Sequence, residues 1–207
     1  ERVLAILPGS RSSEIRILAP RFLQAAALLR QRDPSLHCVV PMVNAQRKAE
    51  FEQILAQYPV PGLRCVTAEQ EPGGTPVAWS VMEAADAVLV ASGTATLETA
   101  LFKRPMVISY VLSPWMRRIM AWKSGQQRPY LPWVGLPNVL LKDFAVPEFL
   151  QDDATPEKLA EACWTSLTDA AGAARIEARF TALHQELLRD TPTLAAQAIL
   201  EVAHGAA

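Results

Sequence analysis

The sequence predicts an α/β protein: a Rossmann-like, doubly wound parallel sheet followed by C-terminal helices. Two observations support this fold class. Short apolar runs alternate with amphipathic helical patterns between residues 3 and 111, which is typical of βαβ units in a parallel sheet. From residue 156 onward the patterns are only helical. Because crossovers between parallel strands are right-handed, helices are expected on both faces of the sheet.

Five buried strands are expected, separated by helical patterns. The run VLAIL (3–7) is the first, and Phe22 and Leu29 mark one face of the helix that follows it. Pro41 indicates an end or a bend of the second strand. The expected strands are residues 3–7, 37–43, 63–68, 87–91 and 105–111. Three more helices are expected between these strands. One has its apolar face at residues 51–58, a short one spans 76–85, and one begins in the loop after residue 91.

The C-terminal part is expected to hold three helical stretches. Thr155 and Thr191 each precede a proline and are the expected N-caps of two of them. Residues 169–172 are expected to separate the first two stretches. We therefore divide the chain into a nucleotide-sugar-binding domain, 1–155, and a helical extension, 156–207, which packs on that domain or on a preceding half of the protein.

Composition excludes several classes of protein. The 207 residues carry a net charge of −1, so no broad field attracts nucleic acid and no nucleic-acid partner is expected. Cys38, Cys65 and Cys163 lie far apart, which argues against a disulfide framework or a zinc site and fits a reducing compartment. No run reaches the roughly 18 apolar residues that predict a membrane span. The chain opens directly on a strand-like segment, and we interpret this opening as that of a fragment.

Two loops rich in small polar residues are expected to meet. LPGSRSSE (7–14) follows the first strand and ASGTATLE (91–98) follows the fourth. In a sheet of order 3-2-1-4-5 these strands are neighbours, and ligands bind beyond their carboxyl ends. The sequence therefore predicts one binding crevice between the two loops.

The first loop offers a phosphate-binding guanidinium. Arg11 presents a fixed fork of donors that suits phosphate oxygens, Gly9 permits a tight turn, and Ser10 or Ser12 is the expected helix cap. The alternative is an ordinary βα turn with a solvated arginine. Neither GxGxxG nor a Walker sequence is present, so no dinucleotide or P-loop fingerprint is found.

The second loop predicts an anion site at a helix N-terminus. Gly93 leaves the backbone open, and Thr94 and Thr96 supply hydroxyls in the first turn. Glu98 lies four residues after Thr94, on the same helix face. A carboxylate suits neutral ribose hydroxyls better than phosphate, because it accepts hydrogen bonds from two vicinal hydroxyls. The alternative is an acid that complements the helix dipole.

Four segments in this order closely resemble the lipid A disaccharide synthase family. They are LPGSRSSEI, ASGTATLETALFKRPMVISY, GLPNVLL and VPEFLQDDATPEKL. The resemblance covers nearly the whole chain and implies the C-terminal, nucleotide-sugar-binding half of a GT-B glycosyltransferase of Gram-negative bacteria. The family joins UDP-2,3-diacylglucosamine to 2,3-diacylglucosamine 1-phosphate (lipid X), which yields the β-1,6-linked disaccharide and UDP.

The resemblance also implies site residues. Arg11 would stabilise the leaving UDP, Glu98 would hold the ribose, and Asn138 would make a polar contact with the donor. The residues that would approach the diphosphate are Gly9, Ser10, Arg11, Ser92, Gly93, Thr94, Ala95 and Thr96. No metal or other cofactor is implied, and the general base is expected in the N-terminal acceptor half, outside this chain. The isolated chain is therefore expected to bind donor and to transfer nothing.

Further partners follow from the resemblance. The apolar and basic segment 113–133 suits a membrane surface or acyl chains, and the alternative is a helix packed on the core with a basic solvated edge. The resemblance implies a protein in the cytoplasm, peripherally associated with the inner membrane. The sequence does not decide whether the protein forms a homodimer or whether its C-terminal helices are exchanged between subunits. Without the resemblance, two alternatives remain: a UDP-sugar 2-epimerase of the same architecture, or a nonenzymatic nucleotide-binding module.

Overall fold

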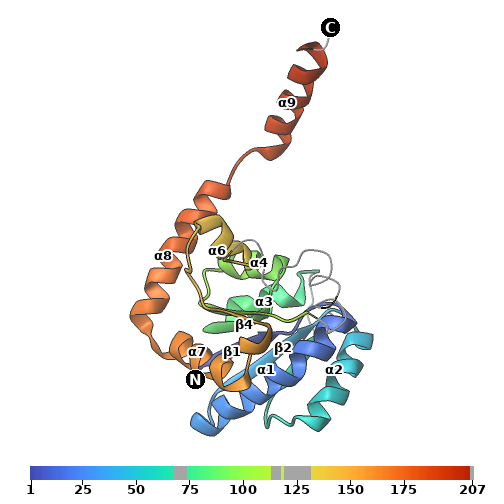
Figure 1. Cartoon of the computed structure of the whole chain (residues 1–207), viewed down its shortest axis with the longest axis vertical. Helices are drawn as coiled ribbons and strands as arrows, with labels where there is room; N and C mark the ends of the chain where they lie inside the picture. Colours follow the sequence, from blue (N-terminus) through green and yellow to red (C-terminus); the bar gives the residue numbers. More distant parts are fainter. Residues whose placement is uncertain (68–73, 113–117, 119–131, 206–207) are drawn as a thin grey trace.

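The computed structural model describes residues 1–67, 74–112, 118 and 132–205. Its centre is a six-stranded parallel sheet of order β3-β2-β1-β4-β5-β6 (Figure 1). The strands are β1 (Val3–Leu7), β2 (His37–Met42), β3 (Arg64–Thr67), β4 (Ala87–Ala91), β5 (Met106–Tyr110) and β6 (Glu148–Leu150). The predicted α/β class and the order of the first five strands are confirmed.

Helices cover both faces of the sheet. One face carries α1 (Ser12–Arg32), α2 (Ala45–Gln57) and α7 (Pro156–Thr168). The other carries α3 (Val77–Ala84), α4 (Thr94–Leu101), α6 (Leu136–Leu141) and α8 (Ala170–Leu187). The alternation along β1 produces this arrangement, because successive side chains of a strand point to opposite faces. Leu4 and Ile6 join the first core, and Ala5 and Leu7 join the second.

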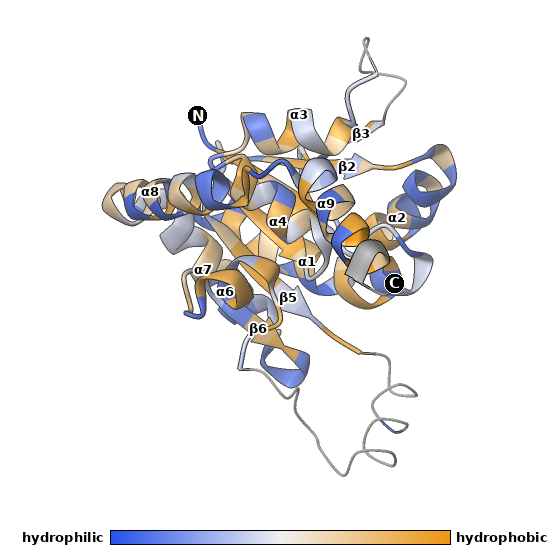
Figure 2. Cartoon of the chain, turned by 90° about the horizontal axis from the view of Figure 1, so that it is seen from above, coloured by the Kyte–Doolittle hydropathy of each residue, from blue (hydrophilic) through white to orange (hydrophobic). Residues whose placement is uncertain are grey.

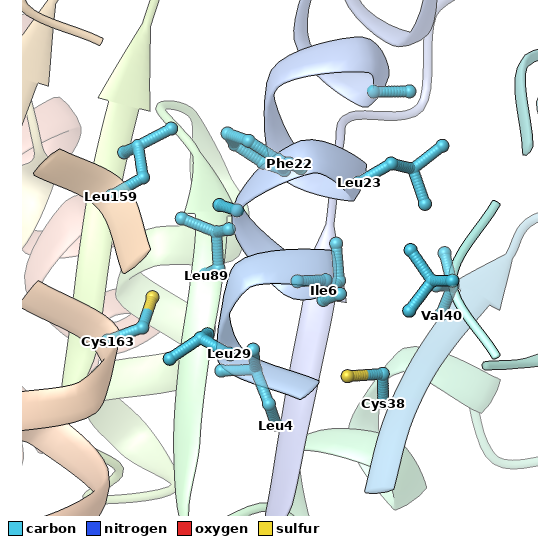
Figure 3. Close-up of a cluster of buried hydrophobic side chains, with 14 of the residues drawn as sticks. Leu4, Ile6, Phe22, Leu23, Leu29, Cys38, Val40, Leu89, Leu159 and Cys163 are labelled. Atoms are coloured by element: carbon cyan, nitrogen blue, oxygen red, sulfur yellow. The ribbon is translucent and has the colours of Figure 1, made fainter. Parts of the chain in front are cut away.

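Helix α7 belongs to the core on the first face. Figure 3 shows its Leu159 and Cys163 in one cluster with Phe22 of α1 and Leu89 of β4. All four side chains are fully buried. Residues 156–168 therefore pack on the sheet of the domain that precedes them.

Two details of the sheet differ from expectation. β2 continues through Pro41 to Met42, because these two residues still pair with Val66 and Thr67 of β3 after the pairing with β1 has ended at Val39. The sixth strand was not predicted: β6 is only three residues long and joins the edge of β5, with Ile108 opposite Glu148. A short edge strand that contains an acid lacks the apolar run by which the other strands are found.

The C-terminal helices are present where expected, with corrected ends. Thr155 caps α7, since its hydroxyl accepts a hydrogen bond from the Lys158 N–H at 3.3 Å. Only Asp169 separates α7 from α8, rather than residues 169–172, because its carboxylate caps the new helix by accepting from the Gly172 N–H at 2.8 Å. Asp190, and not Thr191, caps α9 (Thr191–Gly205), because its carboxylate accepts from the Thr193 N–H at 3.2 Å, whereas the Thr191 hydroxyl donates to the Arg189 carbonyl.

Helix α9 projects away from the body of the molecule. Figure 1 shows it beyond α8, joined by an extended segment. Leu194, Ile199 and Val202 are all exposed on it, and Figure 2 shows both hydrophobic and hydrophilic stretches on its ribbon. No other helix of the described residues stands so far from the sheet in Figure 1.

Candidate functional site

The register of the sheet brings the two polar loops to one edge. β1 and β4 are parallel neighbours, and Leu7 lies opposite Val90 at their carboxyl ends. The first loop leaves β1 one residue later and the second leaves β4 two residues later. The chain also reverses its direction of travel across the sheet here, because β2 lies beyond β1 and β5 beyond β4. This is the switch point at which doubly wound sheets bind ligands, and the predicted neighbourhood of the loops is confirmed.

Glu14 closes over the first loop. Its Oε2 accepts from the N–H groups of Ser10 at 3.1 Å and Arg11 at 3.2 Å, and its Oε1 accepts from Arg11 Nη1 at 2.9 Å. Gly9 has φ 110°, and a Cβ there would lie 2.6 Å from the Cβ of Glu14, so the position requires glycine. The N-cap of α1 is Arg11 and neither expected serine.

The sequence reasoning missed Glu14. Glu14 lies three residues after the N-cap, as the acid of a capping box does, but the N-cap is Arg11. The Ser/Thr-x-x-Glu pattern that signals such a box is therefore absent from the sequence around Glu14. In this conformation the donors predicted for a diphosphate bind the protein's own carboxylate. The Arg11 side chain nevertheless remains 79% exposed in the loop after β1, so its guanidinium is accessible to a ligand.

A cluster of polar and charged side chains around Glu50 holds α1 beside α2, outside the proposed crevice. Ser12 Oγ donates to the Glu50 carboxylate, and Arg16 and Arg47 pair with the same carboxylate at 2.7 and 2.6 Å. The Ser12 hydrogen bond, followed by the contact with Arg16, lowers the pKa of Glu50 below its ordinary value. Ser12 therefore links two helices instead of capping one.

The second loop presents backbone donors more than hydroxyls. Gly93 and Thr94 are exposed, and the N–H groups of Thr94 and Ala95 begin α4, where no intrahelical acceptor exists for them. Thr96 is fully buried, and its hydroxyl donates to the Gly93 carbonyl at 2.7 Å. The Ser92 N–H donates to the Ser109 carbonyl at 2.9 Å. The loop therefore offers Thr94 and Ala95 to an anion more directly than Ser92 or Thr96.

Glu98 lies one turn into α4 and meets a residue that the sequence reasoning did not single out. Trp79 of α3 donates its indole N–H to Glu98 Oε2 at 2.8 Å. The two residues are 19 positions apart in the sequence, so no local pattern indicates the pair. The carboxylate thus lies beside the predicted phosphate site with one oxygen already held.

Asn138 is fully buried and is held by β6 and the turn before it. Its amide nitrogen donates to the Val146 carbonyl and to Glu148 Oε1, both at 2.8 Å, and its oxygen accepts from the Val146 N–H at 3.0 Å. Glu148 also accepts from the N–H groups of Val134 and Gly135 at 2.8 and 2.9 Å. These bonds fix the start of α6, and the Val134 carbonyl lies 3.4 Å from the Ser92 hydroxyl.

A groove at one sheet edge and the segment predicted to face a membrane lie apart from the two loops. A groove of about 570 Å³ lies at the sheet edge between β6 and α7, lined by Phe149, Lys158 and Thr165 among others. Most of the predicted membrane-facing segment, 113–133, lies outside the described residues. None of the helices in the described part of the chain has the length and apolarity that a bilayer crossing requires.

The cysteines are thiols in apolar surroundings. Cys38 and Cys163 are buried and Cys65 is half-buried, and all three are free. Burial raises the pKa of Cys38 and of Cys65 to about 11 and raises that of Cys163 further still. None of them has the lowered pKa that marks a reactive nucleophile.

Comparisons with known proteins support both the fold and the family. The C-terminal CMP-Kdo binding domain of WaaA from Acinetobacter baumannii matches with TM-score 0.55 and 14% identity, over 91% of this chain and 90% of that one. The C-terminal domain of LpcC from Francisella tularensis, a glycosyl transferase group 1 family protein, matches with TM-score 0.56 and 14% identity, over 92% and 87%. The fold is therefore that of a GT-B C-terminal domain.

Sequence relatives are much closer. The lipid-A-disaccharide synthase of Bordetella avium is 87% identical over 208 residues, covering 100% of this chain and 53% of the relative. This chain therefore spans about half the length of that relative. The family model described as lipid-A-disaccharide synthetase matches residues 1–200. Since that match extends over almost the whole chain, the chain belongs to the lipid-A-disaccharide synthase family.

Proposed function

We propose that this chain is the donor-binding half of a lipid-A-disaccharide synthase and holds UDP-2,3-diacylglucosamine in the crevice between β1 and β4. The observation that carries the proposal is the register of these strands, with Leu7 opposite Val90, which sends both polar loops to one edge. Family membership gives the reaction class. The WaaA domain of the same fold is described as binding CMP-Kdo, another nucleotide sugar. Membership also favours this function over a 2-epimerase or a nonenzymatic module.

The diphosphate contacts are proposed from both loops. The free N–H groups of Thr94 and Ala95 at the start of α4 face the anion, with the partial positive charge of the helix end behind them. On the other side, Arg11 turns its exposed guanidinium from Glu14 to the phosphates, and the N–H groups of Ser10 and Arg11 exchange the Glu14 carboxylate for phosphate oxygen. Gly9 and Gly93 keep the backbone open at both loops.

Arg11 has the largest part in this proposal. As the glycosidic bond breaks, negative charge gathers on the leaving UDP, and a positioned guanidinium stabilises it. Glu14 and Glu98 both lie at the crevice and oppose a second anion, so removing Arg11 leaves the diphosphate facing two carboxylates. Glu98 itself accepts hydrogen bonds from the ribose hydroxyls.

Asn138 stays a prediction as a donor contact. In the structure its amide binds Val146 and Glu148, so a direct contact with donor requires these bonds to exchange. Without such a change, Asn138 acts on the site through the turn at Val134, which borders Ser92.

The acceptor half is proposed to lie outside this chain. It would supply the general base that deprotonates the 6-hydroxyl of lipid X, so these 207 residues alone should bind UDP and form no disaccharide. We further propose that α9 docks on that half or on a second copy of the chain, because Leu194, Ile199 and Val202 are exposed along it. Light scattering of the chain with and without residues 189–207 tests the second case.

Because the proposed donor and acceptor are both lipids, we propose that the enzyme acts at the cytoplasmic surface of the inner membrane. Two exposed apolar side chains on and just after α6, Leu140 and Phe144, lie on the segment that borders the second loop. Trp133 packs edge-on against Phe144, with ring centroids 6.2 Å apart. Co-sedimentation with anionic vesicles, compared between the wild type and the Leu140→Ser, Phe144→Ser variant, tests this surface.

Calorimetric titration with UDP tests the proposed site. We expect Arg11→Ala to weaken UDP binding by about tenfold to a hundredfold, the usual effect of one charge-assisted contact. Arg16→Ala is the matched control, since Arg16 pairs with Glu50 outside the crevice. Absence of UDP binding by the wild type, or equal losses in the two variants, would overturn the proposed site.

A further inference from the structure

Trp79 stands at the rim of the proposed nucleotide site with its ring partly open to solvent. It lies on α3, which covers the same face of the sheet as α4. Its side chain packs against Phe102 at the end of α4, with ring centroids 6.3 Å apart and the planes tilted by 59°. The residue remains 43% exposed. The ring is thus packed against Phe102, and its indole N–H points to Glu98 of α4.

The indole N–H is committed to Glu98. Nε1 lies 2.8 Å from Glu98 Oε2, and tryptophan has this single donor and no acceptor. Within the described residues, the indole is the only hydrogen-bonding partner of the Glu98 side chain. A carboxylate has about four acceptor positions, so Oε1 and part of Oε2 remain available after this bond is made.

We propose that Trp79 is a positioning residue that fixes the Glu98 carboxylate for a ribose and so sets a preference for ribonucleotides over 2′-deoxyribonucleotides. The inference rests on the proposed function, since it specifies which sugar of the nucleotide the site selects. Two vicinal hydroxyls need both carboxylate oxygens at fixed places. A glutamate without the indole bond would have to lose its side-chain freedom on binding, which weakens the contact.

The Phe102 contact gives this arrangement its rigidity. Phe102 follows the last residue of α4 and Glu98 lies one turn before it, so Trp79 contacts α4 at two places one turn apart. Trp79→Phe removes the N–H together with part of the indole and keeps a smaller aromatic ring for Phe102. Phe102→Leu keeps the N–H and removes the ring contact. The two variants therefore separate orientation of Glu98 from packing of α3 on α4.

The experiment measures the affinity of the 207-residue chain for UDP and for 2′-deoxyuridine 5′-diphosphate by calorimetry. The readout is the ratio of the two dissociation constants, which a general loss of stability does not change. We expect Trp79→Phe to lower the preference for UDP by about threefold to tenfold, the cost of ordering one long side chain. Glu98→Gln should lower it by at least as much, and Phe102→Leu should leave it unchanged. Circular dichroism confirms that each variant is folded.

Each outcome bears on a different claim. A reduced ratio in Trp79→Phe, with affinity for the deoxynucleotide unchanged, supports the inference. An unchanged ratio in Trp79→Phe, with the ratio lost in Glu98→Gln, overturns the role of Trp79 and leaves the proposed function standing. If the wild type binds neither nucleotide, the proposed function fails and the inference fails with it.

Discussion

Replacing Asn138 by alanine should lower the free energy of unfolding more than replacing any exposed polar residue. The amide makes three hydrogen bonds, two of them to the backbone of Val146. Val146 is 2% exposed, so water cannot replace the lost partner at its N–H or its carbonyl. A buried polar group without a partner costs about 1–3 kcal/mol. Two such groups predict that the free energy of unfolding falls by about 2–6 kcal/mol.

Urea denaturation followed by far-ultraviolet circular dichroism measures this change. The thermal midpoint should fall with it, by about 5–15 °C for a chain of this size. Asn44→Ala is the matched control: Asn44 caps α2 at the surface, accepting from the Arg47 N–H at 2.9 Å. Loss of such a cap costs about 1 kcal/mol. Equal destabilisation by the two variants would refute the reasoning, because it would mean that the buried amide contributes no more than an exposed one.

Three further perturbations have defined outcomes. A Cβ at Gly135 would overlap Ile108 Cδ1 and lie 2.9 Å from Glu148 Oε1, so Gly135→Ala should lower stability to urea by about 1–3 kcal/mol; an unchanged midpoint contradicts this packing. The pKa of Glu50 is lowered chiefly by the Ser12 hydrogen bond, so its contribution to stability is complete above the unfolded value of about 4.3 and is lost as pH falls through the folded-state value. The thermal midpoint of Glu50→Gln should therefore fall less on acidification than that of the wild type. Equal falls in the two proteins would contradict a stabilising role for the cluster around Glu50. Burial raises the pKa of Cys65 to about 11, so its reaction with a thiol reagent should be slow at pH 8 and accelerate as pH rises toward that value; rapid labelling at pH 8 would show a thiolate that the structure does not support.

The sheet could be predicted because its signals are local. Most of the first five strands are short, largely apolar runs, and β4 is buried at every position. The spacing of apolar residues in α1 places Phe22 and Leu29 on its buried face. Strand order then follows from the doubly wound fold class, in which the first strand lies between the second and the fourth. β6 was not predicted, because a strand of three residues at the edge of the sheet is too short to form an apolar run.

The site was only partly predictable, because its contacts join distant residues. The sequence could place the two loops at one edge, since that depends only on strand order. It could not show that Trp79 reaches Glu98, a contact that depends on how α3 packs beside α4. Nor could it show that Asn138 is buried under β6. Glu14 lies close in sequence to the residues it binds, but it escaped because Arg11 stands where the capping-box motif has serine or threonine.

A crystal structure of the chain with UDP tests the central claim most directly. The account predicts the diphosphate between residues 9–11 and 93–95, with the ribose within hydrogen-bonding distance of Glu98. UDP bound in the groove between β6 and α7, or anywhere away from the carboxyl ends of β1 and β4, would contradict it.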